Sequence, residues 1–330
     1  MNKQVTMKDI ATQLGVSIVT VSKALAGKEG MSDELRAKIL KKAKELGYKP
    51  APKKNAAKGA EVKVAILIAE RFVSERSFYA KIYQKMAMEL SARGFIGILE
   101  IVRRESEEGG ILPVSIINNV AQQCVMIGEM RPSYIEKVMA TGVKLIFFDF
   151  TNEEYDVDSI TGDNINGAYS LTRYLVHKGY RRIAFVGSYK ATRSILDRLM
   201  GYLKYHMTKD IEITSRWILP DRDKNGYLID QHLPVDMPEA FMCSSDETAY
   251  RLISNLQKYG YKVPENIAVT GYDDYAEHKV EGVELTTWHV NVDEMISICL
   301  TIISKRAEDP NYRHGNVSVN GCLIERNSTR

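Results

Sequence analysis

Residues 6–49 hold the side chains of this chain whose types and spacing best suit a chemical task. Ser17 carries a hydroxyl that can donate to phosphate oxygens, and Lys23 can donate to a phosphate or to the acceptor atoms of guanine. Ile18 and Val19 can contact the methyl groups of thymine. The side chains in this segment that we expect to contact DNA are Thr6, Ser17, Ile18, Val19, Thr20, Ser22 and Lys23.

Three short helices are expected to position these side chains. The pattern predicts helices over Met7–Leu14, from the cap Ser17 to about Ala26, and from the cap Ser32 to about Leu46. Gly15 and Val16 form a tight turn between the first two, and Gly47 can end the third. A helix, a short glycine-containing turn and a second helix make up the helix-turn-helix unit, whose second helix enters the DNA major groove.

The apolar residues of this segment recur at helical spacing and can share one small core. They are Ile10, Leu14, Val16, Val21, Leu25, Leu35, Ile39 and Leu46. Ile18 and Val19 could pack in this core instead of contacting bases, but their spacing from Val21 and Leu25 leaves at least one of them outside its face. A three-helix bundle with no role in DNA binding is the alternative interpretation.

Charge is unevenly distributed along the chain. Residues 1–60 carry thirteen Lys and Arg against five Asp and Glu, whereas residues 61–330 carry 32 against 37. This asymmetry is expected where one part of a protein meets the phosphate backbone. A charged run alone is usually a solvated face, but on a helix-turn-helix it indicates a phosphate-binding surface.

From residue 62 onward, apolar runs alternate with amphipathic stretches. The predicted strands are Val62–Ala69, Phe95–Val102, Gln123–Ile127, Lys144–Phe148, Arg182–Val186, Ala240–Met242 and Ile267–Thr270. The predicted helices are Phe78–Ala92, Pro132–Thr141, Asn166–Lys178, Arg193–Tyr205 and Glu247–Tyr259. This alternation predicts an α/β fold with parallel sheets covered on both faces. The length exceeds what one core comfortably holds, so we expect two lobes.

Ligands of open α/β sheets bind beyond the carboxyl ends of the strands. The loops at those ends here are 70–77, 128–131, 149–153, 187–193, 244–247 and 271–275. They are rich in side chains that can hydrogen-bond hydroxyl groups, which suits a polyhydroxylated ligand held between two lobes. Strand-end loops are generally polar, so their position alone leaves ordinary solvent-facing loops as an equal alternative.

No sequence motif points to catalysis, a metal or a cofactor. The chain has no GxxxxGK[ST] phosphate loop, no GxSxG turn and no HExxH pair. Its cysteines, which we interpret as free thiols without metal-ligand spacing, are Cys124, Cys243, Cys299 and Cys322. No signal peptide and no apolar run of membrane length is found, so we expect a cytoplasmic protein rather than an exported sugar-binding protein of similar two-lobed architecture.

The chain closely resembles the LacI family of bacterial transcription regulators. The opening motifs that carry the resemblance are Asp9-Ile10-Ala11, Gly15-Val16-Ser17, Thr20-Val21-Ser22 and Gly47-Tyr48-Lys49-Pro50. Later motifs are the stretch 162–187, the Arg198-Leu199-Met200-Gly201 motif, the stretch 244–274 and Leu285-Thr286-Thr287. The resemblance implies a helix-turn-helix domain at 1–49, a hinge linker at 50–60, and a periplasmic-binding-protein-like effector and dimerisation domain at 61–330. The implied lobes are about 61–158 with 291–316, and about 161–288 with 319–330.

The resemblance also implies particular binding residues. In the linker, Lys53 and Lys54 would contact phosphates, and Ala57 stands where the family has a leucine that wedges into the minor groove. Alanine is too small to open a base step, so we expect DNA contact there without the wedge. The effector-binding residues implied are Phe72, Asp149, Arg198, Ser245 and Asp273, together with Asp221 at the position of a pocket aromatic, a role that Trp217 could take instead.

The resulting hypothesis is a sequence-specific repressor that a sugar or glycoside effector releases from DNA. One helix-turn-helix buries too little surface for tight binding, so we expect a homodimer on a near-palindromic double-stranded operator. The chain ends without a heptad segment, which also favours dimers over tetramers. The alternatives are a regulator that uses a nucleobase or other co-repressor, a regulator controlled by a protein partner, and a glycoside-processing enzyme.

Overall fold

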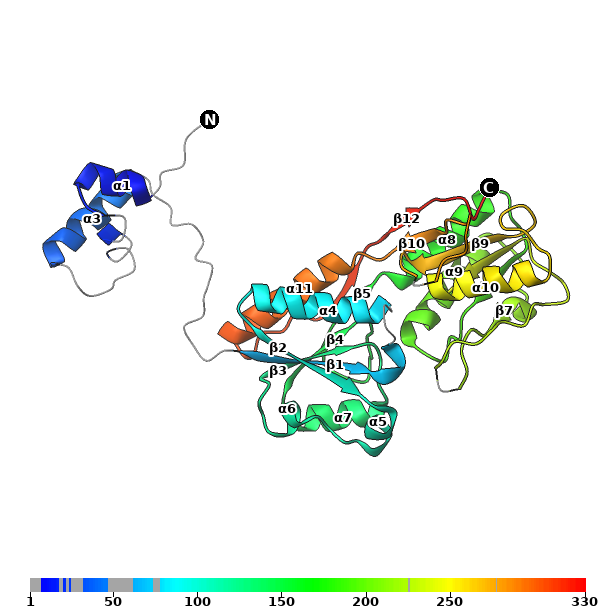
Figure 1. The fold of residues 1–330 in the computed structure, drawn as a ribbon, viewed down its shortest axis with the longest axis horizontal. Helices are drawn as coiled ribbons and strands as arrows, with labels where there is room; N and C mark the ends of the chain where they lie inside the picture. Colours follow the sequence, from blue (N-terminus) through cyan, green and yellow to red (C-terminus); the bar gives the residue numbers. More distant parts are fainter. Residues whose placement is uncertain are drawn as a thin grey trace. The chain divides into compact units, whose positions relative to one another are not determined.

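The computed structural model describes residues 7–17, 20–21, 24, 32–46, 62–73, 78–224, 226–276 and 278–330. The chain divides into two compact units, Met1–Gly59 and Ala60–Arg330, both drawn in Figure 1. The first unit contains the helices α1 (Met7–Leu14) and α3 (Asp33–Glu45). The second unit contains two six-stranded sheets.

The hydroxyls of both predicted serine caps of the first unit accept hydrogen bonds from backbone amides three residues later. The Ser17 hydroxyl accepts a hydrogen bond from the Thr20 amide at 3.0 Å, and the Ser32 hydroxyl accepts one from the Leu35 amide at 3.3 Å. The buried core comprises Ile10, Ala11, Val21, Ala24, Ile39 and Ala43, with Leu14, Val16, Leu35 and Leu46 packed against it. Leu25 and Gly47, to which the sequence assigns a core position and a helix end, lie outside the described residues.

The first sheet of the second unit is wholly parallel, in the order β11-β5-β4-β3-β1-β2. Its strands are β1 (Lys63–Ala69), β2 (Ile96–Val102), β3 (Gln123–Ile127), β4 (Lys144–Phe148), β5 (Asp158–Gly162) and β11 (Asn316–Val319). The helical segments of this lobe, which we call lobe 1, are η1 (Glu70–Phe72), α4 (Phe78–Ala92), α5 (Arg104–Gly109), α6 (Val114–Ile117), α7 (Pro132–Ala140) and α11 (Val292–Glu308). Buried parallel strands explain the near-continuous apolar runs in the sequence.

The second sheet has the order β12-β10-β9-β8-β6-β7 and is parallel except where β12 pairs with β10. Its strands are β6 (Ile183–Val186), β7 (Ile218–Leu219), β8 (Ala240–Cys243), β9 (Ala268–Asp273), β10 (Thr286–His289) and β12 (Cys322–Ile324). Its helical segments, with which it forms lobe 2, are α8 (Asn164–His177), α9 (Arg193–Thr208), η2 (Ser215–Trp217) and α10 (Asp246–Lys258).

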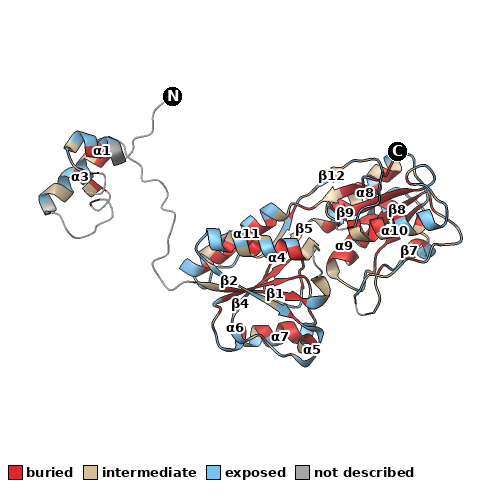
Figure 2. Ribbon diagram, in the orientation of Figure 1, coloured by how far each residue is buried: buried red, intermediate tan, exposed pale blue. Residues whose placement is uncertain are grey.

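Helices cover both faces of each sheet. In lobe 1, α4 and α11 cover one face and α7 the other, while in lobe 2, α8 and α9 lie opposite α10 (Figure 1). The inner strands β1, β3, β4, β5, β6, β8 and β9 are almost entirely buried, whereas the edge strands β2, β7, β11 and β12 are partly exposed (Figure 2). The core on the α4 and α11 face continues through Ile160 and Val290 into the α8 and α9 face. This shared core makes the two lobes one packed unit.

The chain passes between the lobes three times, at 162–164, 289–292 and 319–322. One strand beside a crossing is longer than the sequence predicts. We expected a strand ending at Thr270, but β9 continues to Asp273 and so delivers this carboxylate to the interface of the lobes. Another element begins earlier than predicted, because Asp163 caps α8 by accepting a hydrogen bond from the Asn166 amide at 3.3 Å.

Candidate functional site

A cavity of about 400 Å³, here called the effector cavity, lies where the lobes face one another at the carboxyl ends of β1, β4, β8 and β9. Five of the six effector residues predicted from the sequence line it: Phe72, Asp149, Arg198, Ser245 and Asp273. The first two come from lobe 1 and the others from lobe 2. The strand-end rule therefore correctly locates a cavity that both lobes enclose.

Arg198 occupies the centre of the polar network in this cavity. It lies in α9, which begins after Thr192, whose side chain accepts a hydrogen bond from the Ile195 amide at 3.3 Å. The Arg198 guanidinium is almost fully buried, lies 3.9 Å from the centre of the Tyr272 ring, and donates to the Asn164 side chain at 2.8 Å. A buried guanidinium held on several sides is a rigid donor for ligand oxygens.

Asp273 is the ionic partner of Arg198. One carboxylate oxygen of Asp273, Oδ1, forms an ion pair with Nη2 of Arg198 at 3.0 Å, and no other donor among the described residues reaches it. Burial raises the pKa of Asp273 to about 7, against the opposing attraction of Arg198. A buried acceptor with no further donor is suited to a ligand hydroxyl.

Asp149 faces the same cavity from lobe 1. It accepts a hydrogen bond from the Tyr79 hydroxyl at 2.6 Å, and burial raises the pKa of the Asp149 carboxyl. Both Asp149 and Asp273 have positive φ, 65° and 100° respectively. Such backbone strain in residues other than glycine gathers at functional sites, and here it occurs at two acids that line one cavity.

Ser245 also lines the effector cavity, but its hydroxyl is engaged in capping α10. It accepts a hydrogen bond from the Thr248 amide at 3.2 Å and donates to the Thr248 hydroxyl at 2.9 Å. Its remaining acceptor capacity can still receive one ligand hydroxyl.

Asp221 does not line the effector cavity, contrary to the sequence-based expectation. It is fully buried and accepts hydrogen bonds from the Ser188 amide at 2.7 Å, the Ser244 hydroxyl at 2.7 Å and the Thr248 hydroxyl at 2.8 Å. Burial alone would raise the pKa of Asp221, but Arg222 and these donors outweigh burial and lower it. The Asp221 carboxylate, whose acceptor positions are filled by these donors, joins the loops after β6, β7 and β8. It has little capacity left to accept a hydrogen bond from a ligand.

Trp217, which was considered as a replacement for the pocket aromatic at the position of Asp221, is part of the lobe 2 core. It packs with Phe241 and Ile253, and its indole nitrogen donates to the Asp236 carbonyl at 3.0 Å. Besides the predicted Phe72, the aromatic residues Phe78, Tyr79, Tyr227 and Tyr275 line the effector cavity. Of these, only Tyr275 lies in a predicted strand-end loop, whereas Phe78 and Tyr79 begin the predicted helix over 78–92.

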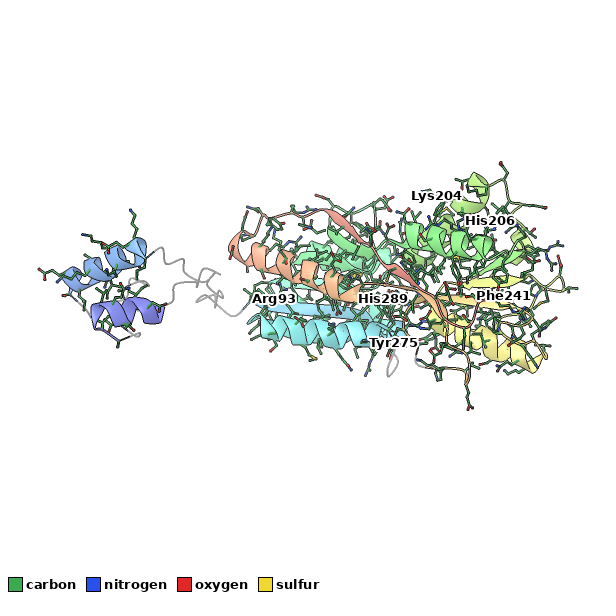
Figure 3. All side chains as sticks on the ribbon, turned by 90° about the horizontal axis from the view of Figure 1, so that it is seen from above. Arg93, Lys204, His206, Phe241, Tyr275 and His289 are labelled. Atoms are coloured by element: carbon green, nitrogen blue, oxygen red, sulfur yellow. The ribbon has the colours of Figure 1, made fainter. Side chains whose placement is uncertain are left out.

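Tyr275 also contributes to the contact between the lobes. Its ring centre lies 6.1 Å from that of Phe78 and 5.1 Å from the Lys81 ammonium. Tyr275 and His289 lie close together where the lobes meet (Figure 3), and both line a smaller cavity of about 210 Å³. His289 is half-exposed, and its Nδ1 lies 3.1 Å from the Asp274 carboxylate.

Arg193 ties the two lobes together beside the effector cavity. Its backbone amide donates to the Glu129 carboxylate at 3.0 Å, and its guanidinium lies 3.6 Å from the same carboxylate. The guanidinium also bonds Glu153. Because Arg193 begins α9 and both acids follow strands of lobe 1, these bonds hold the lobes together around the cavity.

Only part of the predicted DNA-contacting set is described. Ser17 is exposed and Thr20 half-buried, and their hydroxyl oxygens lie 2.8 Å apart. Thr6, Ile18, Val19, Ser22, Lys23, Lys53, Lys54 and Ala57 lie outside the described residues.

The cysteines are free thiols, as the sequence indicates. Cys124, Cys243 and Cys299 are buried, whereas Cys322 is exposed. Burial raises the pKa of the Cys299 thiol to about 12. Within the described ranges, no three His, Cys, Asp or Glu side chains gather as a possible metal site. No described helix is long and apolar enough to cross a membrane.

Comparison with known proteins relates both units to described families. Residues 6–51 match the bacterial regulatory proteins of the lacI family, and residues 172–329 match the periplasmic binding protein-like domain. The transcriptional regulator RegA of Clostridium saccharobutylicum is 27% identical over 335 residues, which is 98% of each chain. The transcriptional repressor PurR of Pectobacterium atrosepticum is 25% identical, over 98% of this chain and 96% of its own length.

Solved structures share the fold across almost the whole chain. The transcriptional regulator CelR in complex with cellobiose aligns with a TM-score of 0.68 at 22% identity, covering 98% of this chain and all of its own. The lac repressor dimer bound to operator and the anti-inducer ONPF aligns with a TM-score of 0.66 at 19% identity, covering 99% of both chains.

Proposed function

This chain belongs to the LacI family of DNA-binding transcription regulators, and we propose that it is a repressor released from its operator by a sugar or glycoside. The observation that carries the proposal is the buried Arg198–Asp273 pair in a cavity that both lobes enclose. Arg198 offers donors, and Asp149 and Asp273 offer acceptors. Alternating donors and acceptors around an aromatic wall suit a ring that bears several hydroxyls.

The named relatives and structures are transcription regulators, and none is named as an enzyme. The proposed site accordingly needs no catalytic group. Arg198 and Asp273 would bind and orient the effector, and Phe72 would pack against its ring. Because a regulator of this kind acts on chromosomal DNA, we place the protein in the cytoplasm.

Ligand binding can reach the DNA-binding unit through the lobes. A ligand that bonds Asp149 in lobe 1 and Arg198 in lobe 2 favours the closed arrangement, which Arg193 and Glu129 also hold. Such a ligand shifts the balance of lobe arrangements by its differential affinity for them. Lobe 1 begins at β1, directly after the linker at 50–60, so a change in this lobe is transmitted to the segment that joins it to the first unit.

The surface of lobe 1 supports a homodimer, as does the need for two DNA-binding units. Exposed apolar side chains lie on the edge strand β2, on the short helix α6 and on the segment before α6: Ile96, Leu99, Ile101, Ile111, Val114 and Ile117. An exposed apolar face of this kind marks an interaction surface. We propose that a second copy covers it, so that two helix-turn-helix units read a near-palindromic operator.

A nucleobase effector is the alternative that one observation favours, because Phe72, Phe78, Tyr79 and Tyr275 could stack on a planar ring. Thermal unfolding of the full chain with a panel of neutral sugars and a panel of nucleobases separates the two. We expect a sugar to raise the unfolding temperature of the wild type, increasingly with sugar concentration, and to have no such effect on Arg198→Ala. Stabilisation by nucleobases alone would overturn the sugar assignment, and no shift with either panel would favour control by a protein partner.

A further inference from the structure

A second cavity, of about 610 Å³, adjoins the effector cavity. It lies at the carboxyl ends of strands that include β2 and β7, one edge strand of each sheet, and is here called the edge-strand cavity. Both cavities are lined by Arg71, Arg222, Gly226 and Tyr227. A ligand bound in the effector cavity therefore has the edge-strand cavity as its immediate neighbour.

The lining of the edge-strand cavity is predominantly basic. Its cations are Arg71, Arg104, Arg131, Lys190, Arg222 and Lys224. Its acids are Glu70, Glu107 and Asp223, and two further acids outside the lining, Glu108 and Asp221, pair with its arginines. Six cations thus face five carboxylates.

The acids of this cavity are occupied by other groups. Glu107 is buried, bonds Arg71, and accepts a hydrogen bond from the Arg131 amide at 2.7 Å. In contrast, Lys190 and Lys224 form no ion pair among the described residues, although Lys190 lies 5.9 Å from the Tyr189 ring centre. The two ammonium groups come from the loops after β6 and β7 and line the same cavity. They add to the positive charge of a lining that holds six cations and three acids.

The effector cavity has a smaller excess of positive charge. Its cations are Arg71, Arg198, Arg222 and Arg251, and its acids are Asp149, Glu247 and Asp273. Its lining thus holds four cations and three acids, against six cations and three acids in the edge-strand cavity.

An aromatic side chain stands at the junction. Tyr227 lines both cavities and is 46% exposed, and Tyr189 in the edge-strand cavity is 40% exposed. Exposed aromatic rings at the mouth of a polar cavity can cover a ligand ring. This arrangement suits a ligand that extends past Tyr227 from one cavity into the other.

We propose that the edge-strand cavity binds an anionic group, a phosphate or carboxylate, held by Lys190 and Lys224. The inference rests on the proposed sugar effector and deepens it: the effector is a sugar that carries this anionic group. Lysine ammonium groups bind such anions as point charges, and the adjoining arginines add directional donors. The buried acids Asp149 and Asp273 of the effector cavity are acceptors that suit ligand hydroxyls rather than an anionic group, so the anionic end of the ligand lies in the edge-strand cavity.

Inorganic phosphate tests the site on the full chain without the sugar. Thermal unfolding and calorimetric titration are run in phosphate and in chloride at matched ionic strength, for the wild type and a Lys190→Gln/Lys224→Gln variant. The control is Lys209→Gln/Lys258→Gln, which removes two exposed lysines of lobe 2 outside both cavities. We expect phosphate to stabilise the wild type and the control, and to bind the Lys190/Lys224 variant at least tenfold more weakly. Equal binding by all three proteins, or no phosphate effect on the wild type, would overturn the proposal.

A second arm identifies the source of the anion. Hexoses and their 1- and 6-phosphates are compared with inorganic phosphate. A sugar phosphate that binds at least tenfold more tightly than its parent sugar in the wild type, but not in the Lys190/Lys224 variant, places the anion on the effector. Additive effects of separate sugar and phosphate would support a free anion beside the sugar and overturn its placement on the effector. A neutral sugar effect lost only in Arg198→Ala, without any phosphate effect, would retain the proposed function and remove this inference alone.

Discussion

The guanidinium of Arg198 and the carboxylate of Asp273 form a buried ion pair, with 3.0 Å between Nη2 and Oδ1. Their side chains are only 6% and 9% exposed. Removing one member of such a pair leaves the other charge buried without compensation. The pair couples α9 to β9, and we propose that it also binds the effector.

Arg198→Ala should lower the free energy of unfolding by about 3 kcal/mol, because it removes the partner of Asp273 and the donor to Asn164. Urea unfolding of the full chain measures this. Arg173→Ala, an exposed arginine on α8 in the same lobe, is the matched control and should change stability by less than about 0.5 kcal/mol. Similar losses in both variants would show that the buried pair stabilises the fold no more than an exposed arginine does.

Asp273 should give the stability a defined pH dependence. Burial raises its pKa from 3.8 to about 7, so between these values the folded protein holds a proton that the unfolded chain has lost. Its contribution to stability is therefore fully present below pH 3.8 and is lost as the pH rises through about 7. Asp273→Asn cannot titrate, so its stability relative to the wild type should rise by about 1 kcal/mol per pH unit across this window.

Denaturant unfolding at pH 5, 6, 7 and 8 measures that difference. The exposed Asp230→Asn in the same lobe is the control and should follow the wild type at every pH. Parallel curves for the wild type and Asp273→Asn would contradict the burial of an ionisable Asp273.

The two serine caps of the first unit separate stability from DNA contact. Ser17→Ala and Ser32→Ala each remove the acceptor of one backbone amide, so each should cost about 1 kcal/mol of stability. Only Ser17 is predicted to bond a phosphate, so only Ser17→Ala should also weaken DNA binding when both variants are fully folded. Fluorescence anisotropy with a labelled duplex measures the affinity, and equal affinities would exclude the phosphate contact.

The basic side chains should fall into two classes. Lys23→Ala should reduce the preference for the operator over random duplex, because Lys23 is predicted to contact bases. Lys53→Ala should weaken binding to all sequences evenly and lower the slope of the logarithmic salt dependence by about 1. Affinities measured over a range of salt concentrations, with operator and random duplex, test this assignment. The same salt slope in both variants and the wild type would show that it is wrong.

The sequence predicts most of the regular elements because their periodicity is strong. The strands over Gln123–Ile127 and Lys144–Phe148 and the helix over Phe78–Ala92 have the predicted bounds. The edge strand β7, of only two residues, is too short to carry such a pattern, and its formation depends on pairing with β6. The helix α11 was not predicted, although Met295, Ile296, Cys299, Leu300, Ile302 and Ile303 recur at helical spacing after the cap Asn291.

The candidate site was predictable where a residue follows directly from a strand end. Asp149 and Phe72 follow their strands closely, and both line the effector cavity. Asp221 also follows a strand, but its carboxylate turns toward Ser188, Ser244 and Thr248. The position of an acid after a strand does not reveal whether its carboxylate faces a ligand or bonds donors of neighbouring loops. Nor can it reveal Tyr79, whose role depends on contact with Asp149 across the lobe.

We propose that a sugar bound in the effector cavity lowers the affinity of the helix-turn-helix units for DNA. The most direct test is the affinity of the full chain for an operator selected from random duplexes, measured with and without the sugar that stabilises the protein. We expect the sugar to weaken operator binding at least tenfold in the wild type and to have no effect in Arg198→Ala, which still binds the operator. Operator affinity that is unchanged or increased by the bound sugar in the wild type would contradict the account.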